Sequence, residues 1–179
     1  VLCPGGFGTL DETLEVLTLV QTGKSPLVPI VLLDEPGGTF WKDALNFMRR
    51  QLEGNRYILP TDMRLMRLVD NAEDAATEID RFYSNFHSSR WLQDRFVMRM
   101  NHVLTDSAVS YMNEHFADLC LKGRFEQQAC CEMELDEPEL QPLPRLSFVF
   151  NGRDHGRLRE LTDFINAKEH WASPLSAEG

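Results

Sequence analysis

The sequence predicts an α/β fold in two parts: a parallel sheet with flanking helices over residues 1–86, then a small α+β module over residues 87–170. Three observations support this prediction. Short apolar runs alternate with helical apolar stripes over the first 86 residues, which is typical of a parallel sheet covered by helices. Near residue 90 these runs give way to alternating strands, which have one face to cover. Hydrophobic residues make up 42% of the 179 residues, enough for a packed core.

The first part contains three predicted strands, each followed by a predicted helix. Val1–Cys3 is apolar and runs into a glycine-rich turn, as the end of a buried strand does. The next apolar residues recur at helical spacing and predict a helix over Thr9–Gln21. Its inner face is predicted to contain Leu10, Leu14, Leu17 and Gln21, widened by Val16 and Val20. The remaining strands are predicted at Leu27–Leu33 and Leu65–Val69, and the remaining helices at Phe40–Glu53 and from Asp70 or Asn71 to Phe86.

The second part predicts a β-α-β-β-α order with an antiparallel sheet. Its strands are expected at Arg95–Val103, Phe125–Met133 and Leu146–Phe150, and its helices from Thr105 or Asp106 to Leu121 and from a turn at residues 151–156 to Lys168. The proline-rich stretch Leu135–Arg145 is predicted to be a loop, and residues 171–179 a flexible tail. Three further residues are interpreted as a joint between domains (Arg90, Trp91 and Arg95), and three methionines as core (Met98, Met100 and Met112).

The charge balance excludes a nucleic-acid-binding protein. The chain has 18 basic and 28 acidic residues, a net charge of −10, and both parts are acidic, so no basic domain is hidden in the average. No apolar run reaches the roughly 18–20 residues that a membrane-spanning helix needs. An anionic ligand must therefore be held by local backbone dipoles and a few placed charges.

The cysteines and histidines point to no metal centre. Cys3, Cys120, Cys130 and Cys131 form no CxxC pair, and the five histidines lack the spacing of a zinc site. Reduced thiols of this kind are typical of a cytoplasmic protein, which is the location we expect.

One segment carries most of the chemical information. Pro4-Gly5-Gly6-Phe7-Gly8-Thr9-Leu10-Asp11-Glu12 follows a predicted strand and opens a predicted helix. Three glycines in four residues let the backbone approach a ligand closely, and the helix adds unpaired N–H groups with the positive end of its dipole. The segment therefore predicts a phosphate cradle that needs no Lys or Arg.

A purely structural interpretation accounts for part of the same segment. Thr9-x-x-Glu12 matches a capping box, and the glycines could serve only the turn. Two familiar nucleotide motifs are excluded, because Asp11 stands where a dinucleotide fingerprint needs its third glycine, and Thr18 where a P-loop needs its first. The capping box does not explain why the glycines lie at the carboxyl end of a strand, where open α/β sheets bind ligands.

The run PGGFGTLDETLEVLTLVQTGK resembles the PGGxGTxxE signature of the Lonely Guy (LOG) family, often called lysine decarboxylases. The resemblance is specific over residues 1–35 and extends to about residue 86, while the second part is similar to the extra domain of longer bacterial members. It implies a Rossmann-like fold and a phosphoribohydrolase, which cleaves nucleoside 5′-monophosphates to free base and ribose 5-phosphate without a cofactor. It also implies a homodimer or a larger homo-oligomer.

The resemblance assigns roles to matching residues only. Gly5, Gly6, Gly8 and Thr9 would hold the 5′-phosphate and the ribose edge, and Glu12 would be the acidic catalytic residue facing C1′. Glu15, one helical turn later, is a candidate accessory acid.

Part of the family's machinery is expected outside this chain. The family's catalytic Arg lies upstream of PGGxGTxxE, so we expect residues 1–179 to be the later portion of a longer protein and inactive alone. Two alternatives stay open from the residues: a non-catalytic nucleotide-binding or carrier protein with the same loop, and an assembly or regulatory module. Asn151–Gly156 with Arg157 is a further candidate anion site, which a turn and a helix cap explain equally well.

Overall fold

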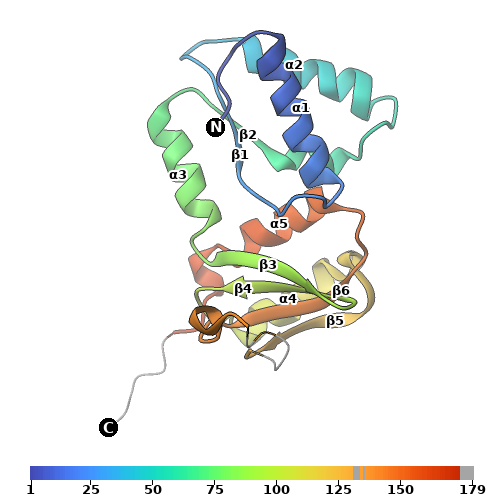
Figure 1. Ribbon diagram of the computed structural model, residues 1–179, viewed down its shortest axis with the longest axis vertical. Helices are drawn as coiled ribbons and strands as arrows, with labels where there is room; N and C mark the ends of the chain where they lie inside the picture. Colours follow the sequence, from blue (N-terminus) through green and yellow to red (C-terminus); the bar gives the residue numbers. More distant parts are fainter. Residues whose placement is uncertain (131–133, 135, 174–179) are drawn as a thin grey trace. The chain divides into compact units, whose positions relative to one another are not determined.

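The computed structural model describes residues 1–130, 134 and 136–173, and its chain divides into two compact units (Figure 1). Unit 1 comprises Val1–Phe82 and Gly152–Glu160, and unit 2 comprises Tyr83–Asn151 and Leu161–Gly179. Most of the tail predicted at 171–179 lies outside the described residues, as does the end of the strand predicted at Phe125–Met133. Among the described residues, no helix is both long and apolar enough to cross a lipid bilayer.

Unit 1 contains a two-stranded parallel sheet with helices. Strands β1 (Ile30–Leu33) and β2 (Met66–Val69) pair in register from Ile30 opposite Met66 to Leu33 opposite Val69. The other elements are listed in chain order: α1 (Phe7–Gln21), α2 (Phe40–Phe47), the π-helix η1 (Met48–Glu53), the 3-10 helix η2 (Pro60–Leu65) and α3 (Ala72–Phe82). The parallel arrangement is confirmed for two of the three predicted strands, both shorter than predicted, whereas the strand predicted at Val1–Cys3 is reduced to an isolated bridge at Leu2.

Local chemistry sets the limits of these elements. Pro29 precedes β1, which then consists of four consecutive apolar residues with Val31 and Leu32 fully buried. Of the two predicted caps for α3, Asn71 is the one used, since its Oδ1 accepts a hydrogen bond from Asp74 N at 2.8 Å. This helix ends at Phe82, four residues before the predicted end at Phe86, because Phe86 starts a strand.

The predicted inner face of α1 is only partly buried. Val20 of the predicted stripe is buried, as is Thr13 outside it, whereas Leu14 is 47% exposed. Thr13 can be buried because its hydroxyl donates a hydrogen bond to the carbonyl oxygen of Thr9 at 2.6 Å. A polar residue that the apolar pattern did not include thus lies in the core.

Unit 2 contains a four-stranded antiparallel sheet in the order β3-β4-β6-β5. Its elements are listed in chain order: β3 (Phe86–Leu92), β4 (Arg95–Met100), α4 (Asp106–His115), the 3-10 helix η3 (Ala117–Leu119), β5 (Cys120–Gln128), η5 (Pro138–Leu140) and β6 (Arg145–Phe150). Helix α5 (His155–Ile165) follows and is shared between the units, and η6 (Lys168–His170) ends the described helices. A separate antiparallel sheet after residue 90 was predicted and is confirmed.

The predicted β-α-β-β-α order is wrong by one strand, because the observed order is β-β-α-β-β-α. The missing strand is β3, which contains Arg90 and Trp91 and pairs along its length with β4. The two strands are joined by Gln93 and Asp94, with Gln93 at φ 54°, a turn without the glycine that usually marks a hairpin. Helix α4 also stops at His115, six residues before the predicted end at Leu121, because β5 begins at Cys120.

The core of unit 2 lies on one face of this sheet. Facing positions on neighbouring strands are aromatic, with Phe96 opposite Phe148 and their ring centroids 5.7 Å apart. The three methionines predicted to be core are fully buried: Met98, Met100 and Met112. Thr105 caps α4 with its hydroxyl, which accepts from Ala108 N, so the first of its two predicted cap residues is the one used.

His155 begins α5 inside unit 1 and packs against the end of α1. A Cβ at Gly23, which has φ 69°, would lie 2.6 Å from His155 Nε2, so this contact and the left-handed backbone both require glycine at position 23. Burial lowers the pKa of His155, and its hydrogen bond with the backbone of Gln21 only partly opposes this. The folded protein therefore favours neutral imidazole more than the unfolded chain does.

We expect the free energy of unfolding to decrease as the pH falls through the ordinary histidine range near 6.5, since the unfolded chain then binds a proton that the folded chain resists. The contribution is fully present above that pKa. Urea denaturation at about pH 7.5 and about pH 5.5 measures it. His155→Gln should reduce this dependence, while His87→Gln, at an exposed histidine, should keep it. An equal dependence in both variants would contradict this role of His155.

Candidate functional site

The glycine turn begins where the chain leaves the parallel sheet. Leu2 forms a parallel bridge with Leu32, donating to Val31 O at 2.8 Å and accepting from Leu33 N at 2.9 Å. Asp34, directly after β1, donates its N–H to Val69 O at 2.9 Å. The turn therefore leaves the sheet at the carboxyl ends of its strands, as predicted, and this is the edge at which open α/β sheets hold ligands.

Helix α1 begins two residues earlier than predicted, and its cap is Gly6. The predicted capping box of Thr9 and Glu12 is therefore wrong, because Thr9 lies inside the first helical turn and Gly6 offers no side-chain cap. The physical reason is that Gly6 takes the extended cap conformation itself, with φ −84° and ψ −158°. The first N–H groups of the helix therefore have no side-chain partner at the cap, and no acidic residue lies in the first turn.

The structure explains the presence of glycine differently at the three positions of the turn. A Cβ at Gly5 would lie 2.1 Å from Thr9 Oγ1, so glycine at this position lets the Thr9 side chain pack against the turn. A Cβ at Gly6 or Gly8 would meet nothing within 4 Å among the described residues, and neither has a positive φ. The fold itself therefore does not require glycine at positions 6 and 8. A ligand that approaches the backbone closely would require glycine at these two positions.

Glu12 and Glu15 lie on the exposed part of α1, one helical turn apart. Neither carboxylate has a hydrogen bond or ion pair among the described contacts. They are three residues apart, so both point to one side of the helix, beyond its first turn. Their carboxylates are therefore open to solvent.

A cavity of about 840 Å³ lies beside the glycine turn and is within the size range of small-molecule sites. Pro4 and Leu10 form one wall, and the other comes from the segment after β1: Asp34, Glu35, Gly38, Thr39, Phe40, Asp43 and Ala44. Glu12 is not part of this lining, since it lies about 200° around the helix axis from Leu10. The structure thus does not bring the predicted acidic residue to the cavity.

Asp34 shapes the second wall of the cavity, and the sequence analysis did not identify it. Its carboxylate accepts hydrogen bonds from Glu35 N at 2.9 Å and from Trp41 N at 3.2 Å, so it caps α2 in place of Thr39, the predicted cap. A Cβ at Gly38 would lie 2.2 Å from Asp34 Oδ1. The signal in the sequence is an acidic residue that ends a buried strand four residues before a glycine.

The other candidates have structural roles in the described residues. Asp154 caps α5 by accepting from Arg157 N at 2.8 Å, and the Arg157 guanidinium pairs with Glu160, so the turn at residues 151–156 includes a helix cap. No group of three His, Cys, Asp or Glu side chains among the described residues is placed to hold a metal ion. Of the cysteines, Cys3 and Cys120 are free thiols, and Cys131 lies outside the described residues.

Part of the chain is similar to known proteins. Residues 1–79 match the family model described as "Possible lysine decarboxylase". The chain is similar to a cytokinin riboside 5′-monophosphate phosphoribohydrolase of Mycobacterium tuberculosis, with 39% identity over 75 residues, which are 42% of this chain and 38% of that protein. It is also similar to the Arabidopsis thaliana enzyme of that name, LOG7, with 29% identity over 86 residues, 48% of this chain and 38% of the relative.

Because a Cβ meets open space at Gly8 and the Thr9 side chain at Gly5, substitution by alanine should change the free energy of unfolding in opposite directions at the two positions. Gly8→Ala should raise the free energy of unfolding by about 0.5–1 kcal/mol, because alanine fits the open space and favours the helix. Gly5→Ala should lower it, because its Cβ would displace Thr9. Urea denaturation of both variants measures the two signs. Destabilisation by Gly8→Ala would show that the fold does need glycine there.

This chain spans only 38% of the length of the matched relatives. The assignment therefore concerns the matched segment. Residues 1–79 are thus similar to the family whose model is described as "Possible lysine decarboxylase", and the matched relatives are named cytokinin riboside 5′-monophosphate phosphoribohydrolases.

Proposed function

We propose that the protein containing this chain hydrolyses the N-glycosidic bond of nucleoside 5′-monophosphates, giving free base and ribose 5-phosphate. The observation that carries the proposal is the start of α1, where Gly6 caps the helix without a side chain and Gly8 leaves the first turn open. Such a helix start presents backbone donors and a positive dipole end to an anion. The names of the relatives, cytokinin riboside 5′-monophosphate phosphoribohydrolases, support this reaction.

The phosphate group is assigned to the backbone of the glycine turn. A dianionic phosphate can accept hydrogen bonds from the N–H groups of the turn and the first helical turn, where no side chain competes at the cap. Gly6 and Gly8 admit the phosphate oxygens closely because they carry no Cβ. Thr9, packed over Gly5, adds a hydroxyl at the edge of this cradle. A net-acidic protein can bind an anion in this way without a general positive field.

Glu12 is assigned to the sugar. Cleavage of the glycosidic bond passes through an oxocarbenium-like state in which positive charge develops at C1′. A carboxylate held one turn beyond the phosphate cradle can stabilise that charge and orient the attacking water. Glu15, on the same side of α1, is assigned an accessory part.

A non-catalytic nucleotide-binding or carrier protein is the second candidate. The same open helix start would hold a phosphate in such a protein, because a cradle by itself does not cleave a bond. The names of the relatives favour the enzyme over the carrier. Release of free base distinguishes the two.

Three further expectations from the sequence, on the sheet, the oligomeric state and the cellular location, stay predictions. The parallel sheet of unit 1 would belong to a Rossmann-like sheet, the protein would form a homodimer or larger homo-oligomer, and it would act in the cytoplasm. An assembly or regulatory role for this chain is likewise untested. Sedimentation of the full-length protein would establish the oligomeric state.

The full-length protein should release base from nucleoside 5′-monophosphates and act poorly on the matching nucleosides, because an uncharged 5′-hydroxyl leaves the backbone donors unused. Chromatography of the free base measures both rates. Gly8→Ala should weaken monophosphate binding while leaving the fold intact, since its Cβ occupies the space assigned to the phosphate. Equal rates for monophosphates and nucleosides would contradict the assigned cradle.

Glu12→Gln should lower turnover by about 10²–10⁴-fold and keep nucleotide binding, since it removes the charge but little volume. Asp11→Asn is the matched control, because it removes an exposed charge from the same turn of α1 and should change turnover little. Turnover of Glu12→Gln at the wild-type rate would make Glu12 an ordinary surface residue.

A further inference from the structure

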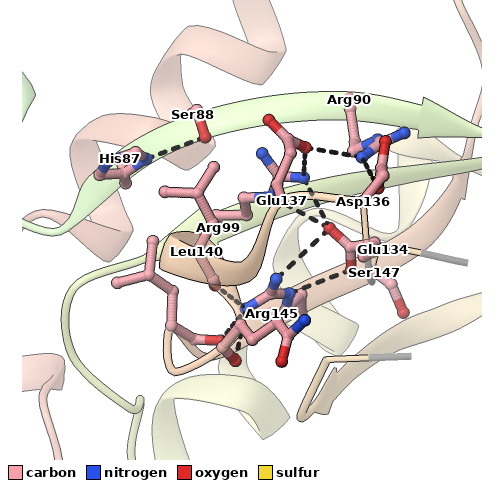
Figure 2. A network of polar contacts seen from close by, with 12 residues as sticks. His87, Ser88, Arg90, Arg99, Glu134, Asp136, Glu137, Leu140, Arg145 and Ser147 are labelled. Atoms are coloured by element: carbon pink, nitrogen blue, oxygen red, sulfur yellow. Dashed lines mark hydrogen bonds and ion pairs between the residues drawn. The ribbon is translucent and has the colours of Figure 1, made fainter. Parts of the chain in front are cut away.

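Buried carboxylates in the described part of the chain generally have a hydrogen-bond donor on each oxygen. In unit 2, Glu134 Oε1 accepts from Arg99 Nε and its Oε2 accepts from Arg145 Nε, each at 3.0 Å (Figure 2). In unit 1, Glu78 pairs with one arginine through Oε1 and with another through Oε2. Asp34 accepts one backbone N–H on each oxygen. This pattern is expected, because a buried acceptor without a donor is costly.

Asp62, in η2, departs from this pattern although it is only 5% exposed. Its described hydrogen bonds both reach Oδ2, from Gln21 Nε2 at 2.6 Å and from Leu59 N at 2.8 Å. Oδ1 is buried and has no partner among the residues that the structure describes. The charge of Asp62 acts on His155, but burial lowers the pKa of that histidine, so the imidazole is neutral near pH 7. Asp62 thus lacks both a donor for Oδ1 and a paired cation.

A pocket of about 110 Å³ in unit 1 has Asp62 in its lining. The other walls are mainly apolar side chains of α1, η1 and η2, among them Leu17 and Leu52, and Asp62 is the one charged residue among the described residues that line it. Leu14, at the α1 side, is 47% exposed, so the pocket opens to solvent. An apolar cavity of roughly 150 Å³ can hold benzene, so this pocket suits a chain of about four carbons.

We propose that this pocket binds a small aliphatic amine in its ammonium form, with the ammonium donating to Asp62 Oδ1 and the alkyl chain packed against Leu17 and Leu52. An ammonium group supplies both of the things that Asp62 lacks, a hydrogen-bond donor and an opposite charge. The alkyl chain covers the apolar walls, whose burial favours binding. An anion would be repelled by the carboxylate, and a neutral donor would bring no counter-charge.

The test is a titration of the full-length protein with n-butylammonium at about pH 7, where the amine is protonated. The ¹³C methyl signals of Leu17, Met48 and Leu52, which line the pocket, report binding. We expect saturable shifts of these signals. n-Butanol has the same chain length without the charge and should bind at least about tenfold more weakly, because it forms no charge-assisted pair with Asp62.

Asp62→Asn should weaken butylammonium binding by at least about tenfold, since it removes the charge and keeps the shape of the side chain. Asp11→Asn is the matched control, because Asp11 is an exposed aspartate of α1 outside the pocket lining. Both variants remove one negative charge from a chain of net charge −10, so a general attraction of cations would fall equally in the two. Leu17→Phe, which fills the pocket and leaves Asp62 in place, should also weaken binding and decides the matter if Asp62→Asn does not fold.

Three results would overturn the proposal. Unchanged methyl signals at millimolar butylammonium would remove the site and leave Asp62 Oδ1 to a buried water. Equal affinity for butylammonium and butanol would show that the carboxylate takes no part. Equal affinity of Asp62→Asn and Asp11→Asn would assign the amine to a general attraction by the acidic chain. The glycine turn is not part of this pocket and base release is not the readout, so failure here leaves the function proposed for that turn standing.

Discussion

The start of α1 is a helix N-terminus without a side-chain cap, and the candidate site depends on this unmet hydrogen-bonding capacity. Helix starts normally satisfy their first N–H groups with a Ser, Thr, Asp or Asn side chain. Here Gly6 occupies the cap position, and the glycine at position 8 costs helix stability without a steric need among the described residues. Open donors and dispensable glycines in one turn are the features on which the proposed anion site rests.

The rest of unit 1 places this helix start at the ligand-binding edge of its sheet. Leu2 is hydrogen-bonded beside β1, so the turn leaves at the carboxyl ends of the strands. Asp34 fixes the neighbouring segment through two backbone N–H groups, and the two segments enclose a cavity. In unit 2, arginines on one face of the sheet pair with carboxylates. The Glu134 side chain in these pairs is buried, and the Glu137 side chain is 37% exposed. Its opposite face is aromatic and packs the core.

The sequence allowed the glycine turn, its place after a strand and the change to an antiparallel sheet to be predicted, since each has a local signal. It did not allow the capping of α1 to be predicted. The rule for caps weighs Thr9 above glycine, whereas Gly6 adopts the cap conformation with no side chain at all. Strand β3 was missed because its centre is polar and its turn lacks glycine, so it is defined by pairing with β4. The arginine face needs the strand register, which no single stretch of sequence contains.

The central claim is that backbone donors at the start of α1 bind the phosphate of a nucleoside monophosphate. The most direct measurement is the change in backbone amide signals of the full-length protein when a monophosphate is added. Saturable shifts at Phe7, Gly8 and Thr9, absent with the matching nucleoside, are the predicted result. Shifts of equal size with the nucleoside, or shifts elsewhere that leave these three amides unchanged, would contradict the account.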